Sequence, residues 1–121
     1  MKSFPELKTN RLYLIEIKNT RLEDIFNIYK DDKVAKYYGL FPLTELSEAK
    51  KEIEFFRKRY SENTGIRWGI SFINTSEIIG TVGFNKIIDH HKDRIGYDLQ
   101  SQHWVKGIMT EALEAILDFI L

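Results

Sequence analysis

The sequence predicts an α/β (α+β) fold in a single domain over residues 1–121. Apolar residues alternate with polar ones along several short segments, as in half-buried strands, and recur every three to four residues along three longer ones, as in amphipathic helices. Hydrophobic residues make up 43% of the chain, including eight Phe, six Tyr and two Trp, which is enough for a packed core. No repeat and no Pro/Gly/Ser-rich linker divides the chain, so a second domain has no support.

The first half of the chain predicts one strand followed by two helices. Alternation predicts a strand over residues 11–18. Thr20 and Glu23 have the spacing of a capping box, which predicts that a helix begins there. Ser47 is the predicted N-cap of the second helix. The apolar stripes comprise Leu22, Ile25, Phe26 and Tyr29 in the first helix, and Ala49, Ile53, Phe56 and Tyr60 in the second.

The second half predicts three strands and then a helix. The first two strands are separated by a short polar turn, which predicts a hairpin. The third strand leads through a polar loop into a helix whose first residue is expected to be Gly107. The predicted strands cover residues 67–72, 78–88 and 94–99, with turns at 74–77 and 89–93. The apolar stripe of the last helix comprises Met109, Leu113, Ile116 and Ile120.

The junction between the last strand and the last helix is the most informative segment. The first N–H groups of a helix lack intrahelical acceptors and carry the positive end of the helix dipole, so they favour bound anions. The amides of residues 105–108, with Lys106 nearby as a point charge, therefore predict a phosphate or pyrophosphate site. An ordinary strand-to-helix turn is the alternative. The motifs of nucleoside triphosphate and dinucleotide sites are absent from the sequence.

The same junction resembles a known family. Gln102, Val105 and Gly107 are similar to the Q/R-x-x-G-x-G/A acetyl-CoA loop of the GNAT N-acetyltransferases, and the best match is their RimJ/RimL-like branch. Further matches occur in family order along nearly the whole chain. They are the segment 7–14, the pairs Arg67-Trp68 and Ile79-Gly80, Gly83, the run Ile95-Gly96-Tyr97-x-Leu99, and Trp104 shortly before Lys106-Gly107.

This resemblance implies an acetyl-CoA-dependent N-acetyltransferase with a mixed, mostly antiparallel sheet flanked by helices. It implies that the loop holds the pyrophosphate of acetyl-CoA and that the main chain near Leu99 and Gln100, where family strands bulge, pairs with the pantetheine amides. A sheet edge that is merely exposed is the alternative interpretation of Leu99 and Gln100. The cofactor-binding residues expected from the resemblance are Leu99, Gln100, Gln102, Val105, Lys106, Gly107 and Ile108.

The resemblance also implies direct attack of a neutral primary amine on the thioester. At pH 7, deprotonating a lysine amine with a pKa near 10.4 costs about 4.6 kcal/mol, whereas a protein α-amine near 8 costs about 1.4 kcal/mol. An N-terminal α-amine is therefore the favoured acceptor. No catalytic base is assigned, because Arg94 stands where the branch often has an acid. Asp98 is the nearest substitute, but a solvated or ion-paired carboxylate is its favoured interpretation.

Two features depart from the family pattern. Val105 stands at the first loop glycine, which predicts an ordinary φ at that residue. The sequence ends at Leu121, within the last helix, which predicts a C-terminally truncated domain that lacks the family's closing strand, helix and hairpin. An exposed sheet edge and an apolar last helix then predict a homo-oligomer. A catalytically silent acyl-CoA-binding or self-associating module is the alternative function.

Composition disfavours several other classes of protein. The 18 basic residues balance 18 acidic ones, so net charge does not favour nucleic acid or an anionic membrane as a partner. The lack of cysteine excludes disulfides and thiolate metal sites. His90 and His91 have no third ligand at a telling spacing, so no metal site is expected. No segment has the ~20 apolar residues of a membrane span, and the N-terminus has no apolar run as long as that of a signal peptide. Cytoplasmic residence is therefore expected.

Overall fold

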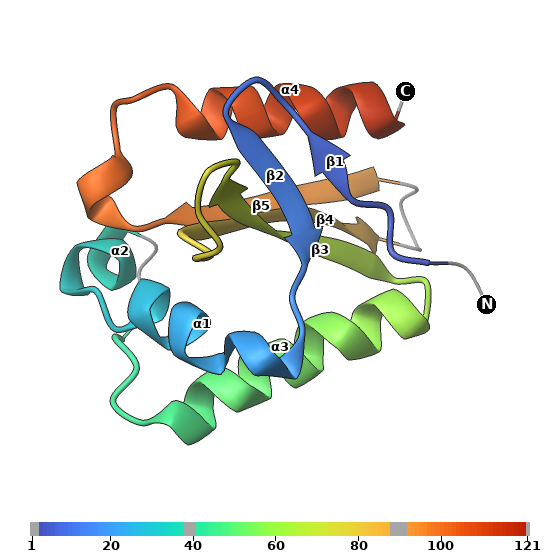
Figure 1. Ribbon diagram of the computed structural model, residues 1–121. Helices are drawn as coiled ribbons and strands as arrows, with labels where there is room; N and C mark the ends of the chain where they lie inside the picture. The colour runs from blue at the N-terminus through green and yellow to red at the C-terminus, as the bar shows by residue number, and fades with distance from the viewer. Residues whose placement is uncertain (1–2, 38–40, 88–91, 121) are drawn as a thin grey trace.

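The computed structural model describes residues 3–37, 41–87 and 92–120 as a single sheet with helices on both faces (Figure 1). Its strands are β1 (Leu7–Lys8), β2 (Leu12–Glu16), β3 (Gly65–Phe72), β4 (Gly80–Ile87) and β5 (Lys92–Leu99). Its helices are α1 (Leu22–Tyr29), α2 (Asp32–Tyr37), α3 (Leu46–Ser61) and α4 (Ile108–Ile120). Short 3₁₀ turns at Asn19–Arg21 and Ser101–His103 precede α1 and α4.

The strands lie side by side in chain order, and every neighbouring pair among the described strands is antiparallel. In the register, Trp68 lies opposite Val82 and Gly80 lies opposite Leu99. This order leaves β5 at one edge of the described sheet. The chain therefore leaves the edge strand directly into the loop that precedes α4.

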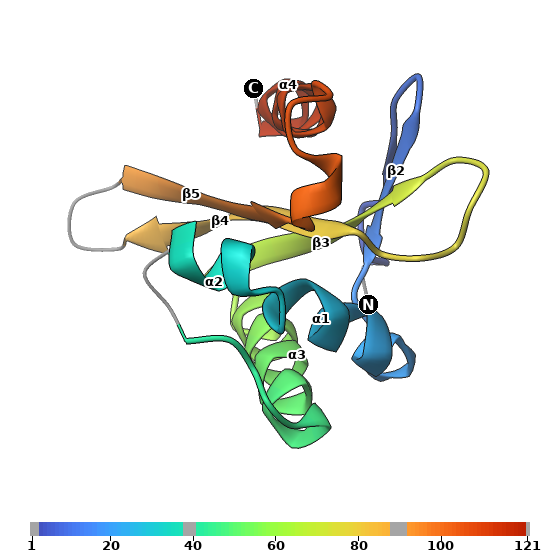
Figure 2. The same cartoon turned by 90° about the vertical axis from the view of Figure 1, so that its left-hand side faces the viewer.

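Two apolar layers hold the helices to the sheet. Figure 2 shows α4 alone over one face, with α1, α2 and α3 over the other. On the α4 side, the buried core consists of Leu12, Leu14, Ile66, Trp68, Ile70, Ile79, Val82, Leu99, Ile108, Ala112 and Ile116. On the other side it consists of Ile17, Ile25, Ile28, Ala49, Ile53 and Ile78. The predicted stripes of α1 and α3 face these layers, and so do Met109, Leu113 and Ile116 of the stripe of α4. The last residue of that stripe, Ile120, is exposed.

The starts of α1 and α3 differ from the sequence-based prediction. No side chain caps α1, because a 3₁₀ turn brings the chain into the helix and places Arg21, not Thr20, at the N-cap. The capping box forms at α3 instead. The carboxylate of Glu48 accepts hydrogen bonds from the N–H groups of Thr44 and Glu45 at 3.0 and 3.1 Å, so the helix begins before the predicted cap, Ser47.

The predicted strands and helices are present, and two short elements were missed. Strand β1 has two residues and α2 has six, which is too short for a periodic pattern to identify either. Helix α4 begins at Ile108, one residue later than expected. No helix in the described part of the chain is long and apolar enough to cross a membrane.

Candidate functional site

The loop between β5 and α4 is anchored at its start by side chains from two directions. The indole Nε1 of Trp104 donates to the carbonyl of Leu99 at 2.8 Å, and its ring packs against Tyr37 of α2 with centroids 5.7 Å apart. Asp31 accepts from the N–H and the hydroxyl of Ser101 at 3.2 and 2.7 Å. These contacts hold the 3₁₀ turn to the end of the edge strand and to the α1–α2 connection.

The loop contains two residues with left-handed backbone. Val105 has φ 62° and Gly107 has φ 72°. The expectation of an ordinary φ at Val105 is therefore wrong. This conformation costs roughly 1–2 kcal/mol for a residue other than glycine, and it is a real outlier for a β-branched one. The Val105 side chain is fully exposed, so its own packing does not favour the conformation, and the anchored residues on either side impose it.

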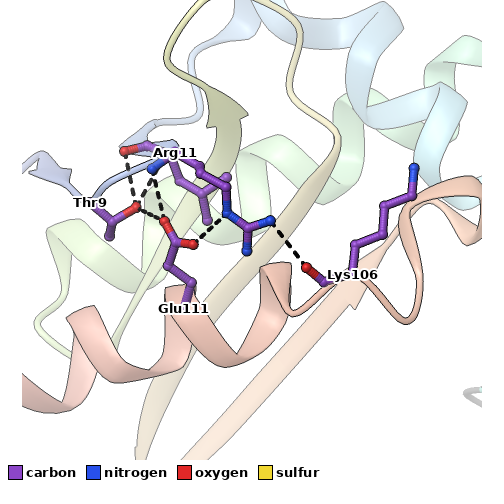
Figure 3. A network of polar contacts seen from close by, with 5 residues as sticks. Thr9, Arg11, Lys106 and Glu111 are labelled. Atoms are coloured by element: carbon purple, nitrogen blue, oxygen red, sulfur yellow. Dashed lines mark hydrogen bonds and ion pairs between the residues drawn. The ribbon is translucent and has the colours of Figure 1, made fainter.

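A polar clamp formed by Thr9, Arg11 and Glu111 ties this loop to the turn between β1 and β2 (Figure 3). Glu111, in the first turn of α4, accepts hydrogen bonds from the hydroxyl of Thr9, from the N–H of Arg11 at 2.9 Å and from Arg11 Nε at 2.7 Å. Arg11 Nη1 donates to the carbonyl of Lys106 at 3.1 Å. Burial raises the pKa of Glu111, but these hydrogen bonds and the Arg11 charge outweigh it and lower the pKa overall.

The backbone amides at the start of α4 have no protein acceptor. Within the described residues, no oxygen accepts a hydrogen bond from the N–H groups of residues 105–110, whereas the next amide, that of Glu111, donates to the Gly107 carbonyl at 3.1 Å. The Lys106 carbonyl, an acceptor within reach of the first turn, is taken by Arg11. The loop therefore presents a row of donors at the positive end of a helix, which is the geometry of an anion site.

These amides open onto a cavity of about 350 Å³ beside the end of β5. Leu99 contributes the strand side of this cavity, and Gly107 and Ile108 contribute the helix side. His103 also lines it, and burial and the Lys106 charge lower the pKa of this imidazole. The remaining lining residues are Tyr37, Tyr97, Trp104, Val105, Met109 and Thr110. This cavity, called the first cavity below, has the apolar side chain of Leu99 on its strand side and amide donors on its loop side.

A second polar cluster lies in the sheet, on the face covered by α1, α2 and α3. Asp98 is only 5% exposed, and its carboxylate accepts from Arg67 Nη2 at 3.0 Å, from the Tyr29 hydroxyl at 2.6 Å and from both the N–H and the hydroxyl of Thr81. Burial and the Asp98 charge raise the pKa of Tyr29 well above its ordinary value. Asp98 is thus an ion-paired carboxylate with its oxygens fully used, as the sequence-based interpretation favoured.

A second cavity, of about 600 Å³, lies over this cluster. Besides Tyr29, Arg67 and Asp98, it is lined by Glu52 of α3 and by the apolar residues Val34, Ala35, Phe41, Leu43, Phe55, Phe56 and Ile95. Gly96 lies in its floor, where a Cβ atom would sit 2.7 Å from Arg67 Nη1. Tyr97 of β5 lines both cavities.

Comparison with known proteins assigns the chain to a family. A family model described as an acetyltransferase (GNAT) domain matches residues 11–121. The chain belongs to the GNAT acetyltransferase family. This GNAT domain is 37% identical over 117 residues to the uncharacterized N-acetyltransferase YoaA of Bacillus subtilis, with 96% of this chain and 66% of YoaA covered. The chain thus spans just under two thirds of the length of that relative.

Solved structures show the same fold. The microcin C7 self-immunity acetyltransferase MccE, in complex with acetyl-CoA and AMP, matches this GNAT domain with a TM-score of 0.75 at 21% identity, covering 92% of this chain and 63% of MccE. RimL, a ribosomal L7/L12 alpha-N-protein acetyltransferase in complex with coenzyme A, matches with a TM-score of 0.75 at 18% identity, covering 92% of this chain and 64% of RimL. At these identities the likeness is one of fold.

The GNAT domain brings together part of the predicted cofactor set. Leu99, Val105, Gly107 and Ile108 line the first cavity, and Lys106 lies in the loop between them. Gln100 and Gln102 do not line it. The Gln100 N–H donates to the Ile79 carbonyl at 2.9 Å, its carbonyl accepts from the His103 N–H, and the Gln102 side chain bonds to that of Gln100 at 3.0 Å.

Sequence reasoning missed Glu52 and the clamp around Glu111. Glu52 follows Ala49 by three residues and precedes Phe56 by four, so it falls within the apolar stripe of α3. A carboxylate at a core-facing position was the available signal. No local signal pointed to the pairing of Glu111 with Arg11, 100 residues away. Among the described residues no group of three His, Asp or Glu forms a metal site, and His90 and His91 lie outside them.

Proposed function

We propose that this GNAT domain binds acetyl-CoA between the end of β5 and the start of α4 and transfers the acetyl group to a primary amine. The observation that carries the proposal is the row of amides over residues 105–110 that lack a protein acceptor and open onto the first cavity. An uncompensated row of donors suits the pyrophosphate of coenzyme A, and an apolar strand side suits the pantetheine arm.

In this proposal each element has a separate role. The amides and Lys106 bind the pyrophosphate, and the clamp of Thr9, Arg11 and Glu111 keeps the loop in the shape that presents those amides. Acetyl-CoA, when bound, supplies the activated acetyl group. The second cavity, which shares the lining residue Tyr97 with the first, receives the amine, and the two substrates approach each other across the edge of β5.

The proposed acceptor is a protein N-terminal α-amine. Its lower pKa makes the neutral, attacking form easier to reach than that of a lysine side chain. The fold neighbour RimL, described as an alpha-N-protein acetyltransferase, is consistent with this choice. A homo-oligomer through β5 and α4 stays a prediction. Its support is the edge position of β5 and the exposure of Leu117, Phe119 and Ile120 on α4.

Calorimetric titration with acetyl-CoA and with acetyl-pantetheine, which lacks the pyrophosphate, tests the proposal. Acetyl-CoA should bind at least tenfold more tightly. Lys106→Glu should weaken acetyl-CoA binding about tenfold through reversed charge near the pyrophosphate, while Lys50→Glu on exposed α3 should leave it unchanged. Equal binding of both compounds would contradict the proposed site. Release of the coenzyme A thiol with a peptide amine then separates a transferase from a silent acyl-CoA-binding module.

A further inference from the structure

Glu52 differs from every other polar group of the second cavity. Arg67, Asp98 and Tyr29 satisfy one another and Thr81 through hydrogen bonds of 2.6 to 3.0 Å. The Glu52 carboxylate, in contrast, has no hydrogen bond and no ion pair with any residue that the structure describes. It is half-buried on the inner side of α3, beside the fully buried Ala49 and Ile53.

The surroundings of Glu52 favour a cationic ligand. The rings of Phe55 and Phe56 and the apolar side chains of Val34 and Ala35 from α2 line the same cavity as the carboxylate. Desolvation raises the pKa of Glu52; the Arg67 charge lowers it and the Asp98 charge raises it, and the net direction is upward. A partly desolvated carboxylate without a partner is unfavourable, and a protonated amine supplies both the charge and the hydrogen-bond donors that it lacks.

The other charged groups around the cavity are unsuited to this role. The groups that face Glu52 are Arg67 from β3, Asp98 from β5 and Tyr29 from α1. Arg67 is a cation, stacked under the Phe56 ring with its guanidinium carbon 5.4 Å from the ring centroid. Asp98 has its acceptor positions filled, and Tyr29 donates its proton to Asp98. Among the described residues that line this cavity, Glu52 is the carboxylate without a hydrogen-bond or ion-pair partner.

We propose that Glu52 binds the ammonium group of the acceptor and removes its proton, and that the acceptor is a primary amine attached next to an apolar group, which the Phe55 and Phe56 rings contact. This inference rests on the proposed function, because it places the acceptor in the cavity that shares the lining residue Tyr97 with the proposed acetyl-CoA cavity. Glu52 is then a catalytic residue, whereas Arg67 and Asp98 are positioning residues that shape the cavity floor.

The proton and electron balance is simple. One N–H proton of the ammonium moves to the Glu52 carboxylate and leaves a neutral amine. Its lone pair attacks the thioester carbonyl carbon; the new C–N bond forms, the C–S bond breaks, and the thiolate of coenzyme A leaves with the electron pair of that bond. The second proton on the nitrogen passes to the thiolate, and the proton on Glu52 returns to water when the amide product leaves. A general base of this kind contributes roughly 10²–10⁴-fold in rate.

The raised proton affinity of Glu52 also bears on which amine it accepts. An α-amine titrates near 8 and a lysine amine near 10.4, so the difference in pKa between the amine and the Glu52 carboxylate is much smaller for an α-amine. The inference therefore favours peptide N-termini that carry an apolar first residue over lysine side chains.

Binding of a defined probe tests the inference without requiring turnover. The probe is the tripeptide amide Phe-Ala-Ala-NH₂, and its N-acetylated form is the uncharged control. By calorimetry, the free amine should bind the wild-type chain and the variant Glu54→Gln, a matched change on the exposed side of the same helix. The variant Glu52→Gln should bind it at least tenfold more weakly, and the acetylated peptide should bind wild type no better than that. Equal affinity of Glu52→Gln and wild type for the free amine, or no binding of the amine to wild type, would overturn the inference.

Two further measurements separate the possible failures. Acetyl-CoA should bind Glu52→Gln and wild type alike. If wild type does not bind acetyl-CoA, the proposed function is rejected. If acetyl-CoA binds normally and Glu52→Gln binds the free amine as tightly as wild type does, only the role of Glu52 is rejected. In thiol-release assays, Glu52→Gln should lower kcat about a hundredfold and remove the acidic limb of the pH profile. A wild-type kcat in that variant would equally overturn the inference. Circular dichroism should show the same fold in all variants.

Discussion

The clamp on the loop before α4 makes a quantitative prediction for Glu111→Gln. The substitution keeps the shape of the side chain but removes its charge and replaces one acceptor oxygen with a donor NH₂ group. That donor then faces the N–H groups of Arg11 or the hydroxyl of Thr9, which donate to Glu111 in the native protein. We therefore expect the variant to lose stability, since at least one hydrogen bond is replaced by two opposed donors.

The structure sets the size of this loss. A hydrogen bond to a charged group contributes about 1.5–3 kcal/mol, and Glu111 accepts three of them. The Arg11 side chain is 46% exposed and that of Glu111 is 20% exposed, so solvent screens the ion pair and the full sum does not apply. We expect the free energy of unfolding to fall by about 2 kcal/mol. With a urea m-value of about 1.5 kcal/mol per M for a chain of this size, the midpoint should fall by roughly 1 M.

The loss should depend on pH. The hydrogen bonds from Thr9 and Arg11 outweigh burial and lower the pKa of Glu111. A folded-state pKa below the unfolded value, which lies near 4.3, means that the carboxylate stabilises the fold above about pH 4.3, and that this contribution disappears as the pH falls through the folded-state pKa. Urea unfolding at pH 7 and pH 3 checks this. The difference between wild type and Glu111→Gln should be largest at pH 7 and smaller at pH 3.

The matched control is Glu114→Gln, which changes an exposed carboxylate one turn further along α4. It should alter the free energy of unfolding by less than about 0.5 kcal/mol. The reasoning is refuted if Glu111→Gln is as stable as wild type at pH 7, if its deficit is the same at pH 3, or if Glu114→Gln is equally destabilised.

Two other substitutions test the remaining packing arguments. Asp98→Asn removes the carboxylate that pairs with the guanidinium of Arg67, and the side chains of this pair are only 19% exposed for Arg67 and 7% for Asp98. Urea unfolding should therefore show a fall in the free energy of unfolding of about 3 kcal/mol. Asp118→Asn, on the exposed side of α4, should show almost none. Val105→Gly relieves a left-handed φ worth about 1–2 kcal/mol and adds roughly 0.5–1 kcal/mol of backbone entropy cost, so thermal unfolding should show a neutral to slightly stabilised protein. A variant destabilised by more than about 1 kcal/mol would show that Val105 is not strained.

Much of the fold was predictable because it depends on short-range pattern. Alternation placed the strand over residues 11–18 near β2, and the i, i+3, i+4 stripe from Ala49 to Tyr60 identified the buried side of α3. Helix starts were less predictable. Thr20 and Ser47 have the right chemistry for caps, but the geometry of the preceding turn decides which residue occupies the N-cap, and that geometry comes from the packing of neighbouring elements.

The candidate site divides in the same way. The donors before α4 could be predicted, because every helix start leaves amides without intrahelical acceptors, and the local sequence shows a polar loop followed by an apolar helix. The left-handed φ of Val105 could not, because the loop is held by Arg11, which lies 95 residues from the Lys106 carbonyl that it contacts. A β-branched residue such as Val105 favours a negative φ, and these long-range contacts override that local preference.

The sequence by itself determined which segments form the main strands and helices and which of their faces are apolar, and it predicts an anion-binding loop between β5 and α4. Only the tertiary structure decided that Glu52 of α3, Arg67 of β3 and Asp98 of β5 line one cavity. It also decided that Asp98 forms an ion pair with Arg67 whereas Glu52 does not. The reason is physical: periodicity reports how a residue sits on its own element, whereas the environment of a charge depends on the register and packing of elements far apart in the chain.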